Sequence, residues 1–129
     1  MAKAVLPPQA KEAEEVIIGS ILLNPEGFRE AQKYIIEDDV FYDDRNKMIW
    51  NKLKKMISSN AIIDQTTVLS EFTDKEKNEG ITAYYITGLT TNAMEQENIE
   101  SYAQIIYKKY LLRRLIKEAH YIKDSAYLA

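Results

Sequence analysis

Apolar side chains recur every three to four residues along most of this chain, the spacing that places them on one face of a helix. The first such stretch runs from Gln9 to Leu23. Pro7 and Pro8 fix its start, and Asn24 and Pro25 end it, because the residue before a proline resists the helical conformation. Its apolar face comprises Ala13, Val16, Ile17, Ile18, Ile21 and Leu22.

The same spacing predicts a second and a third helix. The second begins at Pro25 and runs to about Ile36, with Phe28, Ala31, Ile35 and Gln32 facing inward. The third follows Asp43 or Asp44, since a carboxylate accepts hydrogen bonds from the free amides of a first turn. Its inward positions are Ile49, Trp50, Leu53, Met56 and Ile57.

Two short helices come next. Asp64 is the predicted cap of the first, and Thr73 with Glu76 matches a capping box. A further short helix follows Gly80, and a polar loop is expected from Thr90 to Glu97. The inward residues of these segments are predicted to be Val68, Leu69, Phe72, Ile81, Tyr84, Tyr85 and Leu89.

Residues 98–129 form a helix that is too long for the rest of the chain to cover. Its 32 positions would reach about 48 Å, whereas a 100-residue globule has a radius of gyration near 13 Å. The sequence therefore predicts an all-α fold, with a compact helical head in residues 1–97 and a long projecting C-terminal helix in residues 98–129.

This long helix changes its apolar side around residues 111–114. Ile99, Tyr102, Ala103, Ile106 and Tyr110 share one face, and Leu112, Leu115, Ile116, Ala119, Ile122 and Ala126 share a nearly opposite one. A helix that does this packs first on its own head and then on another body. A second copy of the chain is the simplest candidate. We therefore take Leu112, Leu115, Ile116, Ala119 and Ile122 as the expected oligomer interface.

Composition agrees with a single helical domain. The chain has 129 residues, 46% of them hydrophobic, with only four Gly, three Pro and no Cys. The scarcity of turn-forming residues favours long helices. No apolar run is long enough for a membrane span or a secretion signal, so we expect a soluble cytoplasmic protein without membrane contact.

Charge is unevenly distributed although the net charge is only -3. Ten acids and three bases lie between Gln9 and Asp44, whereas Arg45 to Lys55 holds five bases and no acid. From Lys108 onward six bases stand against two acids. Most such runs are solvated helix faces. We expect the same here, with Arg113 and Arg114 able to bridge to a partner's carboxylate.

Catalytic and cofactor motifs are missing from the sequence. No glycine opens a phosphate-binding loop of the G-x-x-x-x-G-K-[ST] type, so this chain is not expected to hydrolyse ATP. His120 has no His or Cys companion for a metal site and is expected on the surface. The acidic pairs at 38–39 and 43–44 are explained as caps and turns. We predict no catalytic, cofactor or metal residue.

Base stacking on single-stranded DNA is a further use of aromatic residues. Trp50 lies on the same stripe as Leu53 and Ile57, however, and Tyr102 and Tyr110 also lie on an apolar stripe. These aromatic residues are therefore assigned to the core.

Several blocks of the sequence form an ordered and specific set. The opening string from Pro7 to Pro25 is the most specific of them. The others are Phe41 and Tyr42, Met48 to Trp50, Ile63 and Asp64 before Thr67 and Val68, Gly80 to Tyr85, Asn98 to Ala103, and Leu111 to Ile116. In this order the blocks resemble the N-terminal domain of DnaB-type bacterial replicative helicases.

The chain departs from the usual pattern of that family at a few loop positions. Residues 43–46 replace a common proline and histidine, Ile62 and Met94 stand where proline is frequent, and Gln65 replaces an apolar residue. We interpret these departures as those of a divergent copy, for which a phage or prophage is one source.

The resemblance implies a non-catalytic collar domain that assembles a helicase ring and docks primase. The long helix would be the first arm of a helical hairpin. The ATPase motor, with its ATP and Mg, and most DNA contacts would belong to a separate domain. Implied partners are further copies of the chain, as a dimer or within a hexamer, then primase, and a helicase loader as an additional one.

Three other functions stay open on the sequence. The chain could be a free-standing adapter or inhibitor of a replicative helicase, which a reading frame ending near Ala129 would favour. It could be a weak single-stranded DNA-binding module that uses the basic faces at 45–55 and 108–123, with strongly salt-dependent binding. An enzyme is the least supported.

Overall fold

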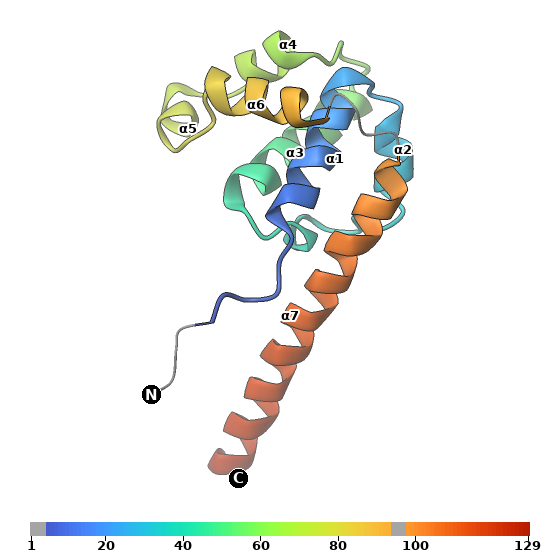
Figure 1. The fold of residues 1–129 in the computed structure, drawn as a ribbon. Coiled ribbons are helices and arrows are strands. Elements are labelled where there is room, and N and C mark those ends of the chain that lie inside the picture. The colour runs from blue at the N-terminus through green and yellow to red at the C-terminus, as the bar shows by residue number, and fades with distance from the viewer. Residues whose placement is uncertain (1–4, 94–97) are drawn as a thin grey trace.

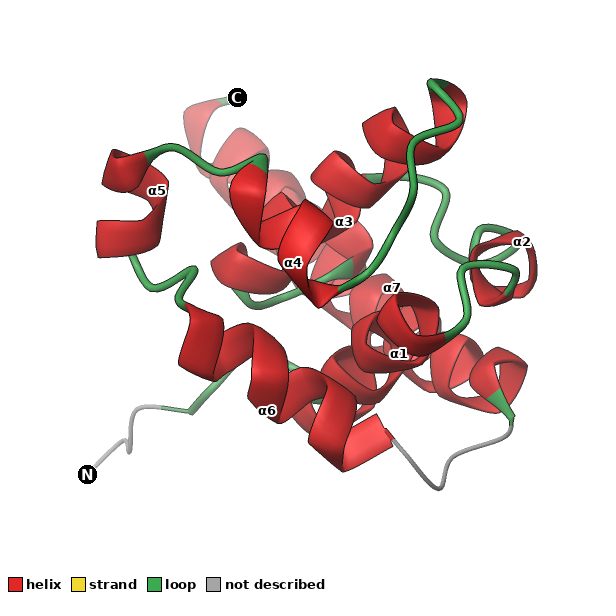
Figure 2. Ribbon diagram, turned by 90° about the horizontal axis from the view of Figure 1, so that it is seen from above, coloured by secondary structure: helices red, strands yellow, loops and turns green. Residues whose placement is uncertain are grey.

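The computed structural model describes residues 5–93 and 98–129, and within them the chain is helical with no strand (Figure 2). This confirms the predicted all-α class. The elements are α1 (Lys11–Leu23), α2 (Gly27–Ala31), the 3-10 helix η1 (Asp38–Val40), α3 (Asp44–Ser58), α4 (Gln65–Ser70), α5 (Asp74–Asn78), α6 (Ala83–Ala93) and α7 (Ile99–Leu128).

Helix α1 lies at the centre of the head and makes its most extensive contacts with α6 and α7. Figure 1 shows α2, α3 and α6 grouped around it, with α7 passing alongside. Ile17, Ile18 and Ile21 of α1 are fully buried. Trp50 of α3 is also buried and stacks on Phe28 with 4.5 Å between the ring centroids, which confirms its assignment to the core.

The predicted helix caps are confirmed. Asp43 accepts hydrogen bonds from the amides of the first turn of α3. Asp64 with Thr67, and Thr73 with Glu76, form reciprocal capping boxes at the starts of α4 and α5. These caps depend on residues close together in the sequence, which explains why the sequence alone identifies them.

The second helix is shorter than predicted. It begins at Gly27 rather than at Pro25 and ends at Ala31 rather than near Ile36. Gln32 is exposed, whereas Phe28, Ala31 and Ile35 are buried as expected. The chain turns after Ala31, which brings the Tyr34 hydroxyl to Glu100 and Gln104 of α7 at 3.0 and 2.8 Å. A contact with a helix far along the sequence thus accompanies the early end.

Two expectations around α6 were wrong. Tyr84 is 90% exposed, and Ile86 is buried instead. The predicted loop from Thr90 is also incorrect, since α6 continues to Ala93 and Thr90 is buried within it. The first error concerns the phase of the helix, and the second concerns where the helix ends. The inward face that packs on α1 comprises Ile86, Leu89, Thr90 and Ala93. The remaining loop positions, 94–97, lie outside the described residues.

Helix α7 has 30 residues and is therefore about 45 Å long. Ala103, Ile106 and Tyr110 are buried against the head, and Ile99 and Tyr102 pack at its edge, as predicted. Beyond Tyr110 every apolar side chain of the helix is exposed. Figure 1 shows this second half extending away from the head.

Substitution of Gly19 tests the close approach of α1 to α6. A Cβ atom at this position would lie 2.0 Å from the carbonyl oxygen of Leu89, which is backbone and cannot move aside cheaply. We expect Gly19→Ala to lower the free energy of unfolding by about 3 kcal/mol, near the upper end for overpacked cores. Urea denaturation followed by circular dichroism measures this change.

Gly88→Ala is the matched control, because a Cβ there meets no atom within 4 Å. An alanine in the middle of a helix should stabilise it by about 0.5–1 kcal/mol relative to glycine. Equal effects of the two substitutions would contradict the close packing of α1 on α6.

Candidate protein interaction surface

The five residues predicted as an oligomer interface lie together on the projecting half of α7. Leu112, Leu115, Ile116 and Ile122 are between 45% and 66% exposed, and Ala119 is exposed as well. We call these five residues the α7 stripe. They are spaced at helical intervals of three or four residues, so they form one continuous apolar strip. The head does not bury them, which leaves the strip accessible to another protein surface.

A shallow groove runs beside this stripe. The N-terminal segment of residues 5–8 lies along α7, and the exposed side chains of Val5 and Leu6 face the same space as Leu112 and Ile116. Lys109, Lys117 and His120 also line this groove. The groove thus adds apolar surface and two lysine side chains to the stripe.

Arg113 lies where α7 leaves the head. Its guanidinium donates hydrogen bonds to the carbonyl oxygens of Pro8, Asp39 and Val40, at 2.9, 2.8 and 3.1 Å. The sequence suggested that Arg113 and Arg114 are able to bridge to a partner's carboxylate. In the structure Nη1 and Nη2 of Arg113 bind backbone carbonyls of their own chain, and the bridge to a partner stays a prediction.

Aromatic rings complete the surroundings of Arg113. Its guanidinium carbon lies 5.7 Å from the ring centroid of Tyr42 and 5.9 Å from that of Tyr110. Burial lowers the pKa of Arg113, and the negative charge of Glu14 and Asp39 opposes that change. An arginine remains protonated at physiological pH. The site therefore holds a permanent, half-buried positive charge.

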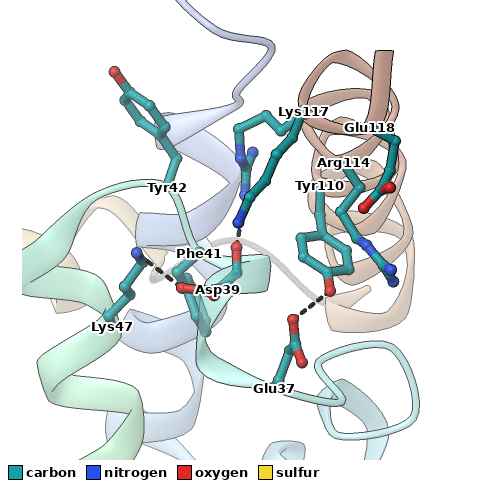
Figure 3. Close-up of a pocket in the computed structure, with 10 residues that line it drawn as sticks. Glu37, Asp39, Phe41, Tyr42, Lys47, Tyr110, Arg114, Lys117 and Glu118 are labelled. Carbon is teal, nitrogen blue, oxygen red and sulfur yellow. Dashed lines mark hydrogen bonds and ion pairs between the residues drawn. The ribbon is translucent and has the colours of Figure 1, made fainter. Parts of the chain in front are cut away.

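An open cleft of about 490 Å³ borders Arg113 between α7 and the segment around η1. In Figure 3 the Tyr110 hydroxyl donates to Glu37, and Lys47 of α3 pairs with Asp39 at 3.2 Å. Most of its charged groups therefore already have partners inside the chain. We describe this junction of α7, η1 and residues 5–10 as the neck.

Glu14 is a fully buried carboxylate that sequence reasoning did not single out. Its two oxygens accept from the amides of Tyr42 and Asp43, at 2.7 and 3.2 Å, and from the Asn46 side-chain amide at 3.0 Å. The helical spacing could have indicated this burial. Glu14 precedes Ile17 and Ile18 by three and four residues, so it lies on the same face of the helix as these buried residues.

The buried Asn46 extends this network to a third helix. Its side-chain oxygen accepts a hydrogen bond from the Tyr85 hydroxyl of α6. Burial, followed by the nearby carboxylate of Asp43, raises the pKa of Tyr85. Burial also raises the pKa of Glu14, although the three hydrogen bonds it accepts act in the opposite direction. The network joins α1, α3 and α6 through polar contacts at the base of the neck.

The histidine and the acidic residues weighed as candidates in the sequence lie on the surface or take part in caps and hydrogen bonds within the chain. His120 is exposed, Asp43 caps α3, and Asp38 accepts a hydrogen bond from Asn51. In residues 5–93 and 98–129, no three His, Cys, Asp or Glu side chains gather as metal ligands would. None of the helices described there is long and apolar enough to cross a bilayer.

The structure is that of an all-α domain in which a compact head carries a projecting C-terminal helix. Residues 6–108 match the family model described as the DnaB-like helicase N terminal domain, and the chain belongs to this family. The replicative DNA helicase DnaC of Bacillus subtilis is 34% identical over 123 residues, which is 95% of this chain. The matched part is 27% of that relative's length, so the chain spans about a quarter of it.

Two solved structures share the fold. The N-terminal domain of DnaB helicase from Mycobacterium tuberculosis superposes with a TM-score of 0.88 at 23% identity, covering 95% of this chain and 88% of that one. The corresponding domain from Helicobacter pylori, described together with its interactions with primase, gives a TM-score of 0.78 at 20% identity, covering 91% of each chain.

A pH series tests the buried carboxylate. Because the pKa of Glu14 is raised on folding, the folded chain holds this proton more tightly than the unfolded one. The resulting stabilisation is complete below the unfolded value of about 4.3 and is lost as the pH rises through the higher folded value. A difference of one between the folded and unfolded pKa values corresponds to about 1.4 kcal/mol.

We compare the free energy of unfolding of the unsubstituted chain, called the parent, with that of the Glu14→Gln variant, which has no carboxyl group to titrate at this position. We expect the advantage of the parent over the variant to be larger at pH 4 than at pH 7. Urea denaturation at both pH values gives the comparison. Glu12→Gln controls for the change in net charge, since Glu12 is exposed on the same helix. A stability difference between parent and Glu14→Gln that does not depend on pH would refute the raised pKa.

Proposed function

We propose that this chain serves as the N-terminal collar domain of a replicative DNA helicase, which assembles the ring and docks primase. The family match and the Bacillus subtilis relative support this role. In this proposal the ATPase motor, with its ATP and magnesium, lies in a separate domain. The domain described here supplies protein contacts rather than chemistry, through a head of residues 1–97 and an arm of residues 98–129.

The observation that carries the assembly role is the exposed α7 stripe. Burying a leucine or isoleucine contributes about 1.5–3 kcal/mol relative to leaving it in water. Two copies can pair their stripes about a twofold axis, so that each stripe covers the other. The same helix would be the first arm of a hairpin in a longer chain. Pairs of such arms would then join heads into a hexameric collar.

Primase is the second proposed partner. The Helicobacter pylori domain with the same fold was described with its interactions with primase, which supports extending this role to the present chain. The groove beside the α7 stripe offers accessible apolar and positively charged groups for such a contact. A helicase loader would be an additional partner of the assembled ring.

Leu115→Asp tests the stripe. An unpaired carboxylate inside a helix pair costs several kcal/mol, so the variant should weaken self-association by about a hundredfold or more. Sedimentation equilibrium over a concentration series gives the mass. Tyr121→Asp is the control. It adds the same charge at a residue that is 69% exposed, against 66% for Leu115, and that lies about 120° around the helix.

If Leu115→Asp associates as strongly as the parent, the α7 stripe is not the interface. If both variants dissociate equally, the added charge alone explains the effect. A parent that stays monomeric at high concentration would leave partner docking as the main role of this chain.

Binding of primase is tested by sedimentation velocity with labelled primase from the same source. We expect a faster-sedimenting complex at micromolar concentrations that persists at 0.3 M salt, where screening removes weak attraction between exposed charges. An unrelated protein of similar size serves as the control. Unchanged sedimentation of primase up to about 100 μM would contradict the docking role.

A further inference from the structure

Arg113 is the last residue of α7 that is partly buried by the rest of the chain. Tyr110, one turn earlier, is the final buried side chain of the helix, and after Arg113 every residue of α7 is exposed. The side chain at this position therefore acts at the point where the helix loses its lateral support.

The acceptors of Arg113 come from two separate segments. Pro8 precedes α1, whereas Asp39 and Val40 belong to η1. Nη1 reaches the first segment and Nη2 the second, so the planar fork spans the gap between them. A lysine ammonium is a single point of charge on a flexible stem and cannot reproduce this divided arrangement.

Because the projecting half of α7 is long, a small change of its direction at the neck displaces its far end by a large distance. Residues 111–128 extend about 27 Å beyond Tyr110, at 1.5 Å per residue. A tilt of 10° at the neck would move the tip by about 5 Å, close to the 5.4 Å pitch of a helix. Side chains in a paired interface would then lose their register along its far end.

From this geometry we propose that Arg113 is a positioning residue that sets the direction of the projecting half of α7 relative to the head. It does so by tying η1 and the N-terminal segment to the neck. The consequence for assembly rests on the proposed function, whereas the direction of the helix is a property of a single chain. The same bond to Pro8 holds residues 5–8 beside α7 and so maintains one wall of the groove.

Arg113→Lys is the variant that tests this role. It keeps the positive charge but replaces the planar guanidinium, whose two nitrogens bind the two segments, by a single ammonium group. Arg114→Lys is the matched control. It makes the same change at the adjacent residue, which is exposed and whose guanidinium carbon lies 5.9 Å from the Tyr110 ring centroid. The chain has no cysteine, so spin labels can be placed uniquely at Lys54→Cys on the head and Ser125→Cys on the arm. Both positions are exposed.

Pulsed electron resonance then gives the distribution of distances between head and arm. The labelled chain is diluted into excess unlabelled chain, so that only distances within one molecule are measured. We expect Arg113→Lys to broaden this distribution about twofold and to weaken self-association roughly tenfold, while Arg114→Lys resembles the parent. Far-UV circular dichroism should show an intact head in both variants.

Two results would overturn the proposal. The distance distribution of Arg113→Lys could be no broader than that of the unsubstituted chain, or the variant could lose the folded head. The last result would make Arg113 a folding residue. If the unsubstituted chain is monomeric, only the assembly role is refuted. The distance measurement within one molecule still tests whether Arg113 sets the direction of α7.

Discussion

The packing of α1 against α6 and α7 is the contact on which the rest of the molecule depends. Helix α1 is covered on several sides, and α6 approaches it so closely that only glycine fits at position 19. With α1 fixed in this way, the first half of α7 has a defined apolar surface on which to pack. The direction of the exposed half follows from that placement.

Burying α1 on several sides also encloses a charge. Glu14 has no exposed surface, and its burial is tolerated because both oxygens accept hydrogen bonds from Tyr42, Asp43 and Asn46. Isolated buried charges are costly, so such a carboxylate persists only where donors surround it. The same loop continues from η1, whose carbonyls receive Arg113. A buried acid and a half-buried base thus hold opposite ends of one short segment.

The sequence predicted what depends on local spacing and missed what depends on distant partners. Caps such as Asp64, the buried face of α3 and the change of side in the last helix are encoded within one or two turns. The early end of α2 accompanies contacts with Glu100 and Gln104, about 70 residues away. The role of Arg113 was likewise hidden, because its acceptors are backbone carbonyls that carry no sequence signal.

The change of side in α7 separates the face that packs on the head from the face proposed for assembly. Taken over all 30 residues, the apolar positions of α7 are spread around most of its circumference, so the helix as a whole has little amphipathic character. Divided near residues 111–114, it becomes two helices with opposite apolar faces. The first face is satisfied by the head of the same chain. The second is not buried by the head, and it is the surface that we propose for a partner. Arg113 lies at this division, so the last partly buried residue of α7 is also the one proposed to orient the surface available for an intermolecular contact.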